Sequence, residues 1–443
     1  MSVLKEIKVE RIVNTFKDLI RINTTNPTGN EIEAIEFLQD ILQKEGIESE
    51  IHMSSPNRAN IIAKLEGKKN NNNPPLIFIS HVDVVGVIEE DWLYDPFAAE
   101  EIDGVIYGRG TLDTKQLTVM ELYSFLHLNK YKDQLNRDVY FIATADEEQG
   151  SHFGMKYLTE QFPMLIPTGL VINEGGGFYL PFKGKDYMLI TVGEKGSSKV
   201  ILRSEGESGH AACPPKNSAM GRMASAIKLL TEYKFPIEKS KISDHFLEIL
   251  NLDPSVFSEL FEYSDSEDDQ TVKKLVEYIL YNEMYINEVD IGERINVIPY
   301  KAEVEIEFRL LPHLTKDRLE VLLNAILANT EVTWEIQSFE PGFESEWSNE
   351  LTIIFQKKII ENGFEATLLP IYALGRTDGR FLGDKGSDVY GFSPLLPDLT
   401  FADVLSKVHQ NNECISIKSL LFGTEVLTQS VSELCMNQKR GET

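Results

Sequence analysis

The sequence predicts an α/β protein in which a mostly parallel sheet forms one domain and a ferredoxin-like α/β sandwich is inserted into it. Three observations support this prediction. Apolar runs alternate with helical patterns over residues 1–190, period-two strand patterns follow Glu194, and a helical pattern resumes after Ser348. With 443 residues, the chain is too long for one ordinary hydrophobic core, so we expect two domains.

The first part of the chain has the pattern of a parallel sheet covered by helices. Three short apolar runs, at residues 74–80, 139–145 and 169–173, are typical of buried strands. Between them, residues 117–131 and 153–162 have apolar side chains at helical spacing. Strands that alternate with helices in this way usually lie parallel, so their carboxyl ends meet at one edge of the sheet.

The middle of the chain has the order strand, helix, two strands, helix, strand, which is the plan of a small α/β sandwich. The elements that we expect lie at residues 198–206, 217–233, 294–299, 302–312, 315–327 and 331–339. Residues 236–285 are acidic and mainly helical in pattern, and they indicate no chemistry. The predicted boundaries are 1–192 and 341–443 for the two parts of the main domain and 193–340 for the insertion.

Composition and charge restrict the possible partners. Lys and Arg total 43 against 70 Asp and Glu, which gives a formal net charge of -27 and a pI near 4.8. Nucleic acids and anionic membranes would repel such a chain, so neither is an expected partner. A small-molecule substrate remains, and an anionic one would need a local basic patch.

The cysteines and the N-terminal segment favour a cytoplasmic location. Cys213, Cys414 and Cys435 are widely spaced and form no CxxC pair, as is typical of a reducing compartment. The first 22 residues place apolar residues at helical spacing between charges, which indicates a surface helix rather than a signal peptide. No apolar run approaches the ~20 residues that a membrane span requires.

A possible metal ligand follows the first buried strand directly, in the tripeptide His81-Val82-Asp83. Residues i and i+2 of a strand point to the same side, so Asp83 can accept the second ring N–H of His81. Such a bond fixes the tautomer and leaves the other ring nitrogen for a metal ion. Taken alone, the tripeptide is equally typical of a buried structural histidine.

Acidic residues at the other predicted strand ends strengthen the metal hypothesis. Asp113 lies in a glycine-rich turn before a helix, Glu147 and Glu148 follow the strand at 139–145, and Glu174 follows the strand at 169–173. In a parallel sheet these ends lie along one edge, where such folds place their sites. One acid there is usually a solvated cap, but a histidine and acids at several ends together predict a metal site.

The charge of this cluster favours two divalent ions. Three ligand carboxylates and one hydroxide carry four negative charges, which two such ions would balance. Histidine and carboxylate together suit Zn²⁺, with Co²⁺ or Mn²⁺ as possible substitutes. Water on such ions is acidic enough to supply the attacking hydroxide. If the strand geometry continues, adjacent Glu147 and Glu148 point in different directions, so one can bind metal while the other acts as general base.

Many segments of the chain together resemble one enzyme family. In chain order they read SHVDVVG, DWLYDPF, GVIYGRGTLDTK, ATADEEQG, INEGGG, GEKG, GHAACP, RINVIP, FRLLP, TDGRF and VHQNNECI. They are similar to the zinc-dependent exopeptidase and deacylase family of acetylornithine deacetylase, succinyl-diaminopimelate desuccinylase, carboxypeptidase G and aminoacylase. The resemblance covers most of the chain outside residues 236–285 and implies hydrolysis of an amide bond next to a carboxylate.

The resemblance also implies individual roles. It makes His81, Asp113 and Glu174 the ligands of one metal ion and Asp113, Glu148 and His409 the ligands of the other. The peptide bond after the bridging Asp113 is cis in this family. Glu147 is then the general base, which later protonates the leaving amine, and Asp83 orients His81.

The remaining implied roles concern the substrate and the inserted domain. His210 would polarise the oxyanion, often from a partner subunit, together with Asn296, and Arg380 would bind the substrate carboxylate. The inserted domain would then serve as a lid and as the surface of a homodimer. Two positions depart from the family: Arg376 stands where a second glycine is usual, and Gln116 replaces the glycine after the lysine of the bridging motif. Arg376 either crowds the pocket or adds a second anion contact.

Three functional hypotheses follow. The first is a dinuclear metallohydrolase of the carboxypeptidase, dipeptidase or aminoacylase type, acting on a peptide or an N-acyl amino acid with a free carboxylate. The second is a catalytically silent metal-binding or interaction protein, for which the departures at Arg376 and Gln116 are the only indication. The third is an α/β protein without metal. The sequence leaves open which substrate class the enzyme would use.

Overall fold

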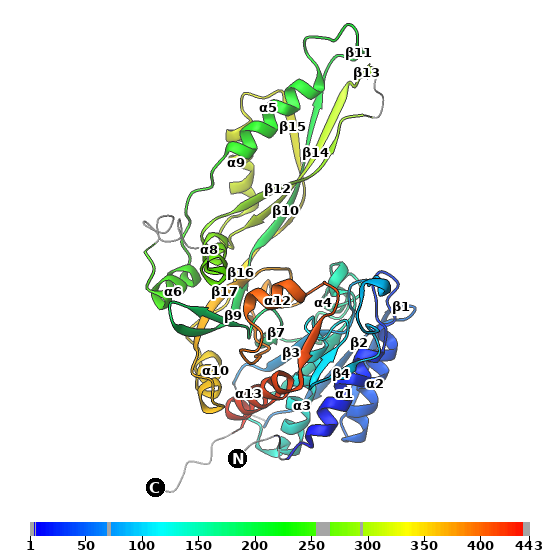
Figure 1. The fold of residues 1–443 in the computed structure, drawn as a ribbon, viewed down its shortest axis with the longest axis vertical. Helices are drawn as coiled ribbons and strands as arrows, with labels where there is room; N and C mark the ends of the chain where they lie inside the picture. The colour runs from blue at the N-terminus through cyan, green and yellow to red at the C-terminus, as the bar shows by residue number, and fades with distance from the viewer. Residues whose placement is uncertain (1–3, 5, 69–71, 254–265, 293–295, 437–443) are drawn as a thin grey trace. The chain divides into compact units, whose positions relative to one another are not determined.

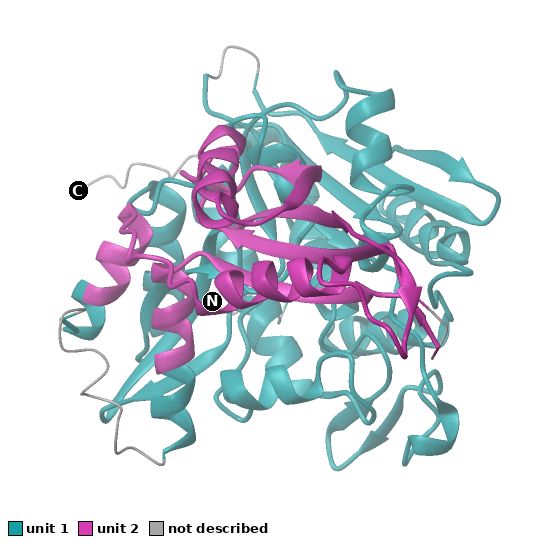
Figure 2. Ribbon diagram, turned by 90° about the horizontal axis from the view of Figure 1, so that it is seen from above, with its two compact units in different colours: residues 1–193, 248–272, 344–443 teal, residues 194–247, 273–343 magenta. Residues whose placement is uncertain are grey.

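The chain folds into two compact units in the computed structural model, which describes residues 4, 6–68, 72–253, 266–292 and 296–436. Unit 1 comprises residues 1–193, 248–272 and 344–443, and unit 2 comprises residues 194–247 and 273–343 (Figure 2). Residues 248–272 thus group with unit 1, although they fall inside the range predicted for the insertion.

A mixed sheet is the centre of unit 1 (Figure 1). Along its main path the strands are β1 (Ser49–Ser55), β2 (Arg58–Leu65), β6 (Val139–Thr144), β3 (Leu76–His81), β7 (Leu170–Asn173), β18 (Asp388–Gly391), β9 (Lys185–Glu194) and β16 (Phe343–Glu344). Two further strands, β8 (Tyr179–Phe182) and β17 (Thr367–Ala373), pair with β9. The four central strands, β6, β3, β7 and β18, run parallel, whereas β1, β2 and β8 pair antiparallel.

The central strands are buried because they consist almost entirely of apolar residues. Every residue of β3 and of β6 is buried, as expected for strands covered on both faces. A parallel α/β sheet was predicted from these runs, and the mostly parallel centre of the observed sheet agrees with that prediction. Their carboxyl ends, at His81, Thr144 and Asn173, lie at the same edge of the sheet.

Helices pack on this sheet and on one another. They are α1 (Val9–Arg21), α2 (Glu31–Lys44), α3 (Lys115–Lys130), α4 (Met155–Gln161), α10 (Glu350–Glu361), α11 (Arg380–Gly383), α12 (Phe401–Lys407) and α13 (Ile417–Cys435). The most deeply buried is α3, which contacts β3, β6, α1 and α13 (Figure 1). A small sheet of β4 (Glu100–Ile102), β5 (Val105–Tyr107) and β19 (Cys414–Ser416) joins the start of α13 to the segment before α3.

Unit 2 contains a four-stranded antiparallel sheet with two helices. The strand order is β12 (Glu283–Asp290), β14 (Lys301–Leu310), β10 (Gly196–Glu205) and β15 (Val332–Glu340). Helices α5 (Ala219–Glu232) and α9 (Lys316–Leu327) contribute Met223, Leu230, Leu319 and Leu323 to one apolar core with the sheet. In chain order the unit reads strand, helix, two strands, helix, strand, the plan expected of a small α/β sandwich.

One strand of unit 2 was predicted in the wrong place. The second strand of its sheet is β12. Of the segment predicted for that strand, residues 294–299, the structure describes residues 296–299, which contain the short β13 (Val297–Ile298). Most of β12 is exposed or half-buried at the sheet edge, so it lacks the apolar run that marked the other strands. Residues 236–285 otherwise contain α6 (Lys241–Leu250) and α8 (Glu267–Leu280), in line with the helical pattern.

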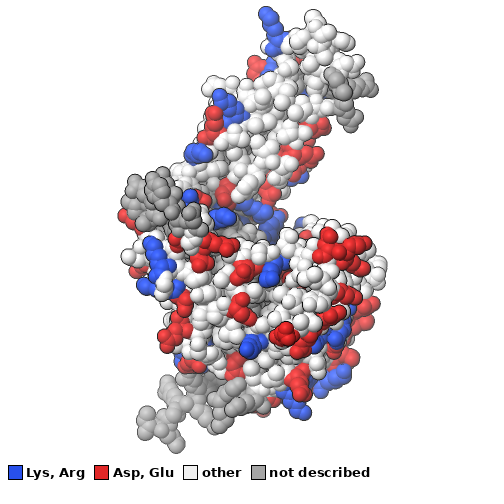
Figure 3. Space-filling view, in the orientation of Figure 1, with Lys and Arg blue, Asp and Glu red and all other residues white. Residues whose placement is uncertain are grey.

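In the view of Figure 3, acidic side chains predominate among the charged residues of unit 1, in line with the net charge of -27, whereas acidic and basic side chains are mixed on unit 2. All three cysteines are free thiols: Cys213 is exposed, while Cys414 and Cys435 are buried. Within the described part of the chain, no helix is long and apolar enough to cross a membrane.

Candidate metal centre

The candidate site lies at the carboxyl edge of the parallel strands of unit 1. His81 is the last residue of β3, Glu174 directly follows β7, and Glu147 opens a short 3-10 turn (Glu147–Gln149) just after β6. Asp113 lies in the turn that leads into α3, and His409 follows α12. The parallel strands therefore bring together residues that are far apart in sequence.

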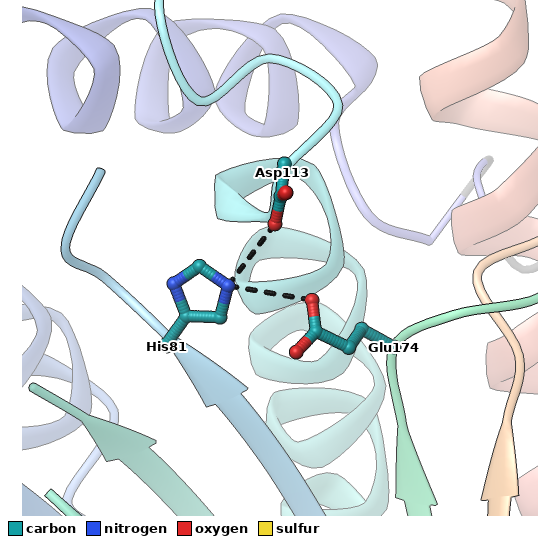
Figure 4. Close-up of side chains that lie close together, drawn as sticks. All are labelled: His81, Asp113 and Glu174. Carbon is teal, nitrogen blue, oxygen red and sulfur yellow. Dashed lines mark hydrogen bonds and ion pairs between the residues drawn. The ribbon is translucent and has the colours of Figure 1, made fainter. Parts of the chain in front are cut away.

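The first group of potential ligands is His81, Asp113 and Glu174 (Figure 4). His81 Nε2 lies 3.1 Å from Asp113 Oδ1 and 3.3 Å from Glu174 Oε2. His81 is only 1% exposed, so its ring is held by the protein on all sides. In the close-up, the three side chains point toward one another from a strand end, a turn and a second strand end.

The second group is Asp113, Glu148 and His409. His409 Nε2 lies 3.1 Å from Asp113 Oδ2 and 3.2 Å from Glu148 Oε2. The two oxygens of Asp113 therefore face two different histidines, one in each group. This is the arrangement that a bridging carboxylate needs.

The donor sets fit divalent cations. In each group the ligand atoms of one histidine and two carboxylates lie within 4.8 Å of one another, and the groups share Asp113. Imidazole nitrogen with carboxylate oxygen is the chemistry that zinc, cobalt and manganese accept. The residues present thus fit two divalent ions, one in each group.

Without metal, these groups hold protons between them. Hydrogen bonds to Asp113 and Glu148 raise the pKa of His409 to about 10. Burial raises the pKa of Glu174 to about 7, although the nearby His81 opposes this. Burial alone would raise the pKa of Asp113, but its hydrogen bonds with His409 and His81 outweigh burial and hold that pKa below its usual value.

Asp83 was expected to accept the second ring N–H of His81 with its carboxylate, but the nearest acceptor is its backbone carbonyl. His81 Nδ1 lies 3.0 Å from the backbone carbonyl of Asp83 and 3.5 Å from carboxylate Oδ1, so the carbonyl is the nearer acceptor. The carboxylate instead accepts the backbone N–H groups of Glu147 and Glu148, each at 3.1 Å, and the side-chain amide of Asn26. The i, i+2 argument missed this because β3 ends at His81 and Asp83 lies beyond the strand.

Glu147, which the resemblance implies to be the general base, lies beside the ligand groups. It belongs to neither ligand group, yet it neighbours the ligand Glu148 and only 10% of its side chain is exposed. Burial, with the nearby charge of Glu174, raises the pKa of Glu147 well above its usual value. A carboxylate with a raised pKa can both accept and return a proton near neutral pH.

The arginines expected to bind substrate differ in exposure. Arg380 is 5% exposed; its guanidinium donates to the backbone carbonyls of Thr377 (2.6 Å) and Gly150 (3.3 Å) and lies 3.8 Å from Glu147 Oε1. Arg376 is half-buried in the loop between β17 and α11. Arg380 is therefore also part of the packing around Glu147, which its motif alone did not indicate.

The second departure from the family pattern is accommodated locally. The Gln116 side chain donates to the carbonyl of Leu112 at 2.7 Å, so it closes the turn that carries Asp113 and takes no ligand away. The Asp113–Thr114 peptide bond in this turn is cis, as the resemblance implied.

His210 and Asn296 lie next to each other in unit 2. The short strand β11 (Gly209–His210) pairs with β13, where His210 opposes Val297, and Ala211 N donates to the Asn296 carbonyl at 3.1 Å. The His210 ring accepts the backbone N–H of Ala212 at 3.2 Å. Two residues predicted for one role are thus neighbours, on a unit separate from the one that holds the metal groups.

Glu413 supports the candidate site, and the sequence alone did not indicate it. It is fully buried, and its carboxylate accepts the backbone N–H groups of Leu112 (2.6 Å), Gly110 (3.2 Å) and Asp113 (3.2 Å) and the guanidinium of Arg109 (2.6 Å). It therefore fixes the turn that presents Asp113. The only signal was its place four residues after His409 in VHQNNECI.

Comparison with known protein families shows to which family this chain belongs. The family described as peptidase family M20/M25/M40 matches residues 77–433, which is most of the chain and includes every ligand of both groups. The chain belongs to this family. It is therefore a metal-dependent hydrolase of amide bonds, as the resemblance predicted.

Individual relatives are distant but cover most of the chain. The N-fatty-acyl-amino acid synthase/hydrolase PM20D1 of Homo sapiens is 27% identical over 383 residues, covering 82% of this chain and 74% of the relative. The probable succinyl-diaminopimelate desuccinylase of Staphylococcus aureus (strain MSSA476) is 26% identical over 386 residues, covering 85% and 87%. The M20 family metallo-carboxypeptidase Sso-CP2 of Sulfolobus solfataricus has the same fold, with a TM-score of 0.70, 19% identity and coverage of 95% and 98%.

Replacing Glu413 with Gln should loosen the turn at Asp113. Four donors converge on this carboxylate, and a side-chain NH₂ would face some of them while Arg109 loses its counter-charge. Breaking a buried pair in this way costs about 3–5 kcal/mol. We expect a lower melting temperature and an affinity for Zn²⁺ weakened by about tenfold or more, measured by calorimetric titration.

A suitable control for this variant is Glu433→Gln, which removes a partly exposed ion pair between α13 and Lys357 and Lys358 of α10. Such pairs contribute about 0–1 kcal/mol, so the control should keep both properties close to wild type. Unchanged Zn²⁺ affinity in Glu413→Gln would contradict the assigned role.

Metal binding to the metal-free protein should release protons. His409, with its pKa raised to about 10, is protonated at neutral pH, and Glu174, with a pKa of about 7, is partly so. A cation must displace these protons, so its affinity should fall as the pH falls from 8 toward 6, and it should rise in the opposite direction. Calorimetric titration with Zn²⁺ in buffers of different ionisation enthalpy measures the release. Binding without proton release would contradict the arrangement.

Proposed function

We propose that the chain is a dinuclear hydrolase that cleaves a peptide or an N-acyl amino acid bearing a free carboxylate. The observation that carries this proposal is the position of Asp113, whose two oxygens each face one histidine of a separate ligand group. Relatives named as an N-fatty-acyl-amino acid synthase/hydrolase and a probable succinyl-diaminopimelate desuccinylase support the substrate class.

Glu147 moves the proton in this proposal. When bound, two divalent ions would polarise the amide carbonyl and lower the pKa of water. Glu147 accepts a proton from the attacking water and returns it to the nitrogen of the leaving amine, and its buried setting suits both steps. The ligand chemistry favours Zn²⁺, with Co²⁺ or Mn²⁺ as alternatives.

The substrate carboxylate needs a cation in this acidic chain. We assign it to Arg380, because a planar guanidinium can bind a carboxylate through two hydrogen bonds and because Arg380 lies beside Glu147. Arg376, four residues earlier and more exposed, is the alternative or additional contact.

Unit 2 would complete the site as a lid and as a dimerisation surface, with residues 193–340 as the inserted domain between residues 1–192 and 341–443. Its contribution would be His210 together with Asn296, which we assign to stabilising the oxyanion, in a homodimer from the partner subunit. The adjacency of these two residues supports a shared role. We also propose a cytoplasmic location, which the three free thiols support.

A substrate panel with Glu147→Gln tests the proposed chemistry. Dipeptides and N-acetyl, N-succinyl and N-fatty-acyl amino acids would be incubated with the metal-free protein after addition of Zn²⁺, Co²⁺ or Mn²⁺. We expect hydrolysis that a chelator abolishes and that falls by about 10²–10⁴-fold in Glu147→Gln, because proton transfer is lost. Metal content should stay at two ions per chain in that variant. Full activity in Glu147→Gln would contradict its assignment as base.

Replacing Arg380 with Ala tests the carboxylate contact. The preference for a free carboxylate over the corresponding methyl ester, as a ratio of kcat/KM values, should fall by about 10–100-fold, since a charged hydrogen bond is worth about 1.5–3 kcal/mol. Arg376→Ala is the matched comparison from the same loop, and thermal melting checks folding of both variants. Retained preference in Arg380→Ala with loss in Arg376→Ala would move the role to Arg376.

A further inference from the structure

We infer that Arg58 is a positioning residue for the reaction, because it holds the loop that presents Glu147 and Glu148. This inference rests on the proposed roles of those two residues as base and ligand. Arg58 lies at the start of β2 and belongs to neither ligand group. It acts on the loop along two routes, one through Asp146 and one through Asn26 and Asp83.

The sheet register places Arg58 beside the loop. Strand β2 runs antiparallel to β6, with Ile61 opposite Ala143 and Ala63 opposite Phe141. Continued by three residues, the same register sets Arg58 opposite Asp146, two residues beyond the end of β6. The first residue of β2 therefore meets the segment at which the chain leaves the sheet to form the site.

The first route is a direct ion pair. Arg58 Nη1 binds the Asp146 carboxylate, and the other Asp146 oxygen accepts the backbone N–H of Phe153 at 3.0 Å. Asp146 has a left-handed backbone, with φ of 64°, and begins the turn that contains Glu147 and Glu148. Such a backbone is uncommon for a residue with a side chain and persists where its surroundings fix it. The ion pair supplies one of those fixed contacts.

The second route passes through Asn26. Arg58 Nη2 donates to Asn26 Oδ1 at 2.6 Å and to the carbonyl of Pro27 at 2.7 Å. The amide group of Asn26 in turn donates to the carboxylate of Asp83. That carboxylate accepts the backbone N–H groups of both Glu147 and Glu148. The Arg58 guanidinium is thus linked to the Glu147-Glu148 segment twice: through Asp146, which precedes it, and through Asn26 and Asp83, which binds its backbone N–H groups.

The shape of the arginine matters for both routes. Arg58 is 5% exposed, and its neighbours Asp146 and Glu31 are 2% and 0% exposed, so the cation is needed to balance buried acids. A lysine would keep this charge, but its single ammonium cannot reproduce a planar fork that binds two groups in fixed directions. Arg58→Lys therefore separates charge balance from positioning.

The chain offers a matched control at the other end of β6, the strand that Asp146 follows. Arg137 is 4% exposed and lies two residues before β6, whereas Asp146 lies two residues after it. The Arg137 guanidinium binds the Pro74 carbonyl, the Asn136 side chain and Glu350, none of which contacts the ligand groups. Arg137→Lys thus makes the same change to a buried arginine away from the site.

The experiment compares Arg58→Lys, Arg137→Lys and wild type as full-length chains, well below their melting temperatures. Zn²⁺ binding is measured by calorimetric titration against a competing chelator, and kcat and KM are measured on a substrate from the panel. Of the two Zn²⁺ ions, we expect the one with the lower affinity to bind Arg58→Lys at least about tenfold less tightly than it binds wild type. The kcat of this variant at saturating Zn²⁺ should also fall at least about tenfold while KM stays within about twofold. Arg137→Lys should match wild type in both measurements.

A second variant covers the case in which Arg58→Lys does not fold. Asn26→Ala cuts only the route to Asp83 and leaves the pair of Arg58 with Asp146 in place, so it should show a smaller loss of the same two properties. Wild-type Zn²⁺ affinity and kcat in Arg58→Lys, or in Asn26→Ala if the first does not fold, would overturn the inference. If wild type binds two ions and Glu147→Gln is inactive, such a result overturns the role of Arg58 alone. A wild type that binds no Zn²⁺ overturns the proposed function and this inference together.

Discussion

The shared carboxylate of Asp113 is the constraint on which the site depends. One oxygen must face His81 at the end of a strand, and the other must face His409 from the loop after α12. A small rotation of this side chain would break one contact while it improved the other. The turn that carries Asp113 must therefore be fixed more firmly than an ordinary surface turn. Glu413 and Gln116 both bind this turn from within the protein, and Arg109 pairs with the Glu413 carboxylate.

Burial of so many acids sets the second constraint. Asp83, Asp146 and Glu413 lie buried at one edge of the sheet, and Glu174 lies there half-buried. Buried charges are tolerated only when they are paired and hydrogen-bonded. Three of these acids bind no metal in our proposal: Asp146 pairs with Arg58, Glu413 pairs with Arg109, and Asp83 accepts backbone N–H groups. The acids of the two ligand groups have histidines, and divalent ions suit the charge that remains.

Much of this site could be predicted from the sequence because its ligands follow apolar strands that are easy to recognise. His81, Glu148 and Glu174 each stand within a few residues of such a strand, and parallel strands end at one edge. His409 has no such neighbour, and only its resemblance to a known segment identified it. The edge strand β12 was missed because an exposed edge needs no apolar run.

Side-chain contacts that depend on how the strands are aligned in the sheet could not be predicted from the sequence pattern. Nothing local distinguishes Arg58 from any other arginine at the start of a strand; its role appears only when β2 is aligned with β6. Asp83 illustrates the same limit. Its spacing from His81 predicted a contact between the two side chains, which approach to 3.5 Å, but the chain turns after His81, and the carboxylate also accepts N–H groups of the loop after β6.

The turn that carries Asp113 and the loop that carries Glu148 are fixed in the same way. A buried carboxylate accepts backbone N–H groups of site residues: Asp83 accepts those of Glu147 and of the ligand Glu148, and Glu413 accepts that of the ligand Asp113. Bonds to the backbone fix where each side chain begins and leave its carboxylate oxygens available for other partners. A carboxylate also accepts several N–H groups at once, which an amide of the same shape cannot do. Its negative charge lies close behind the ligands, so it adds to the field that attracts a cation. Positioning and electrostatics are therefore supplied by the same two residues.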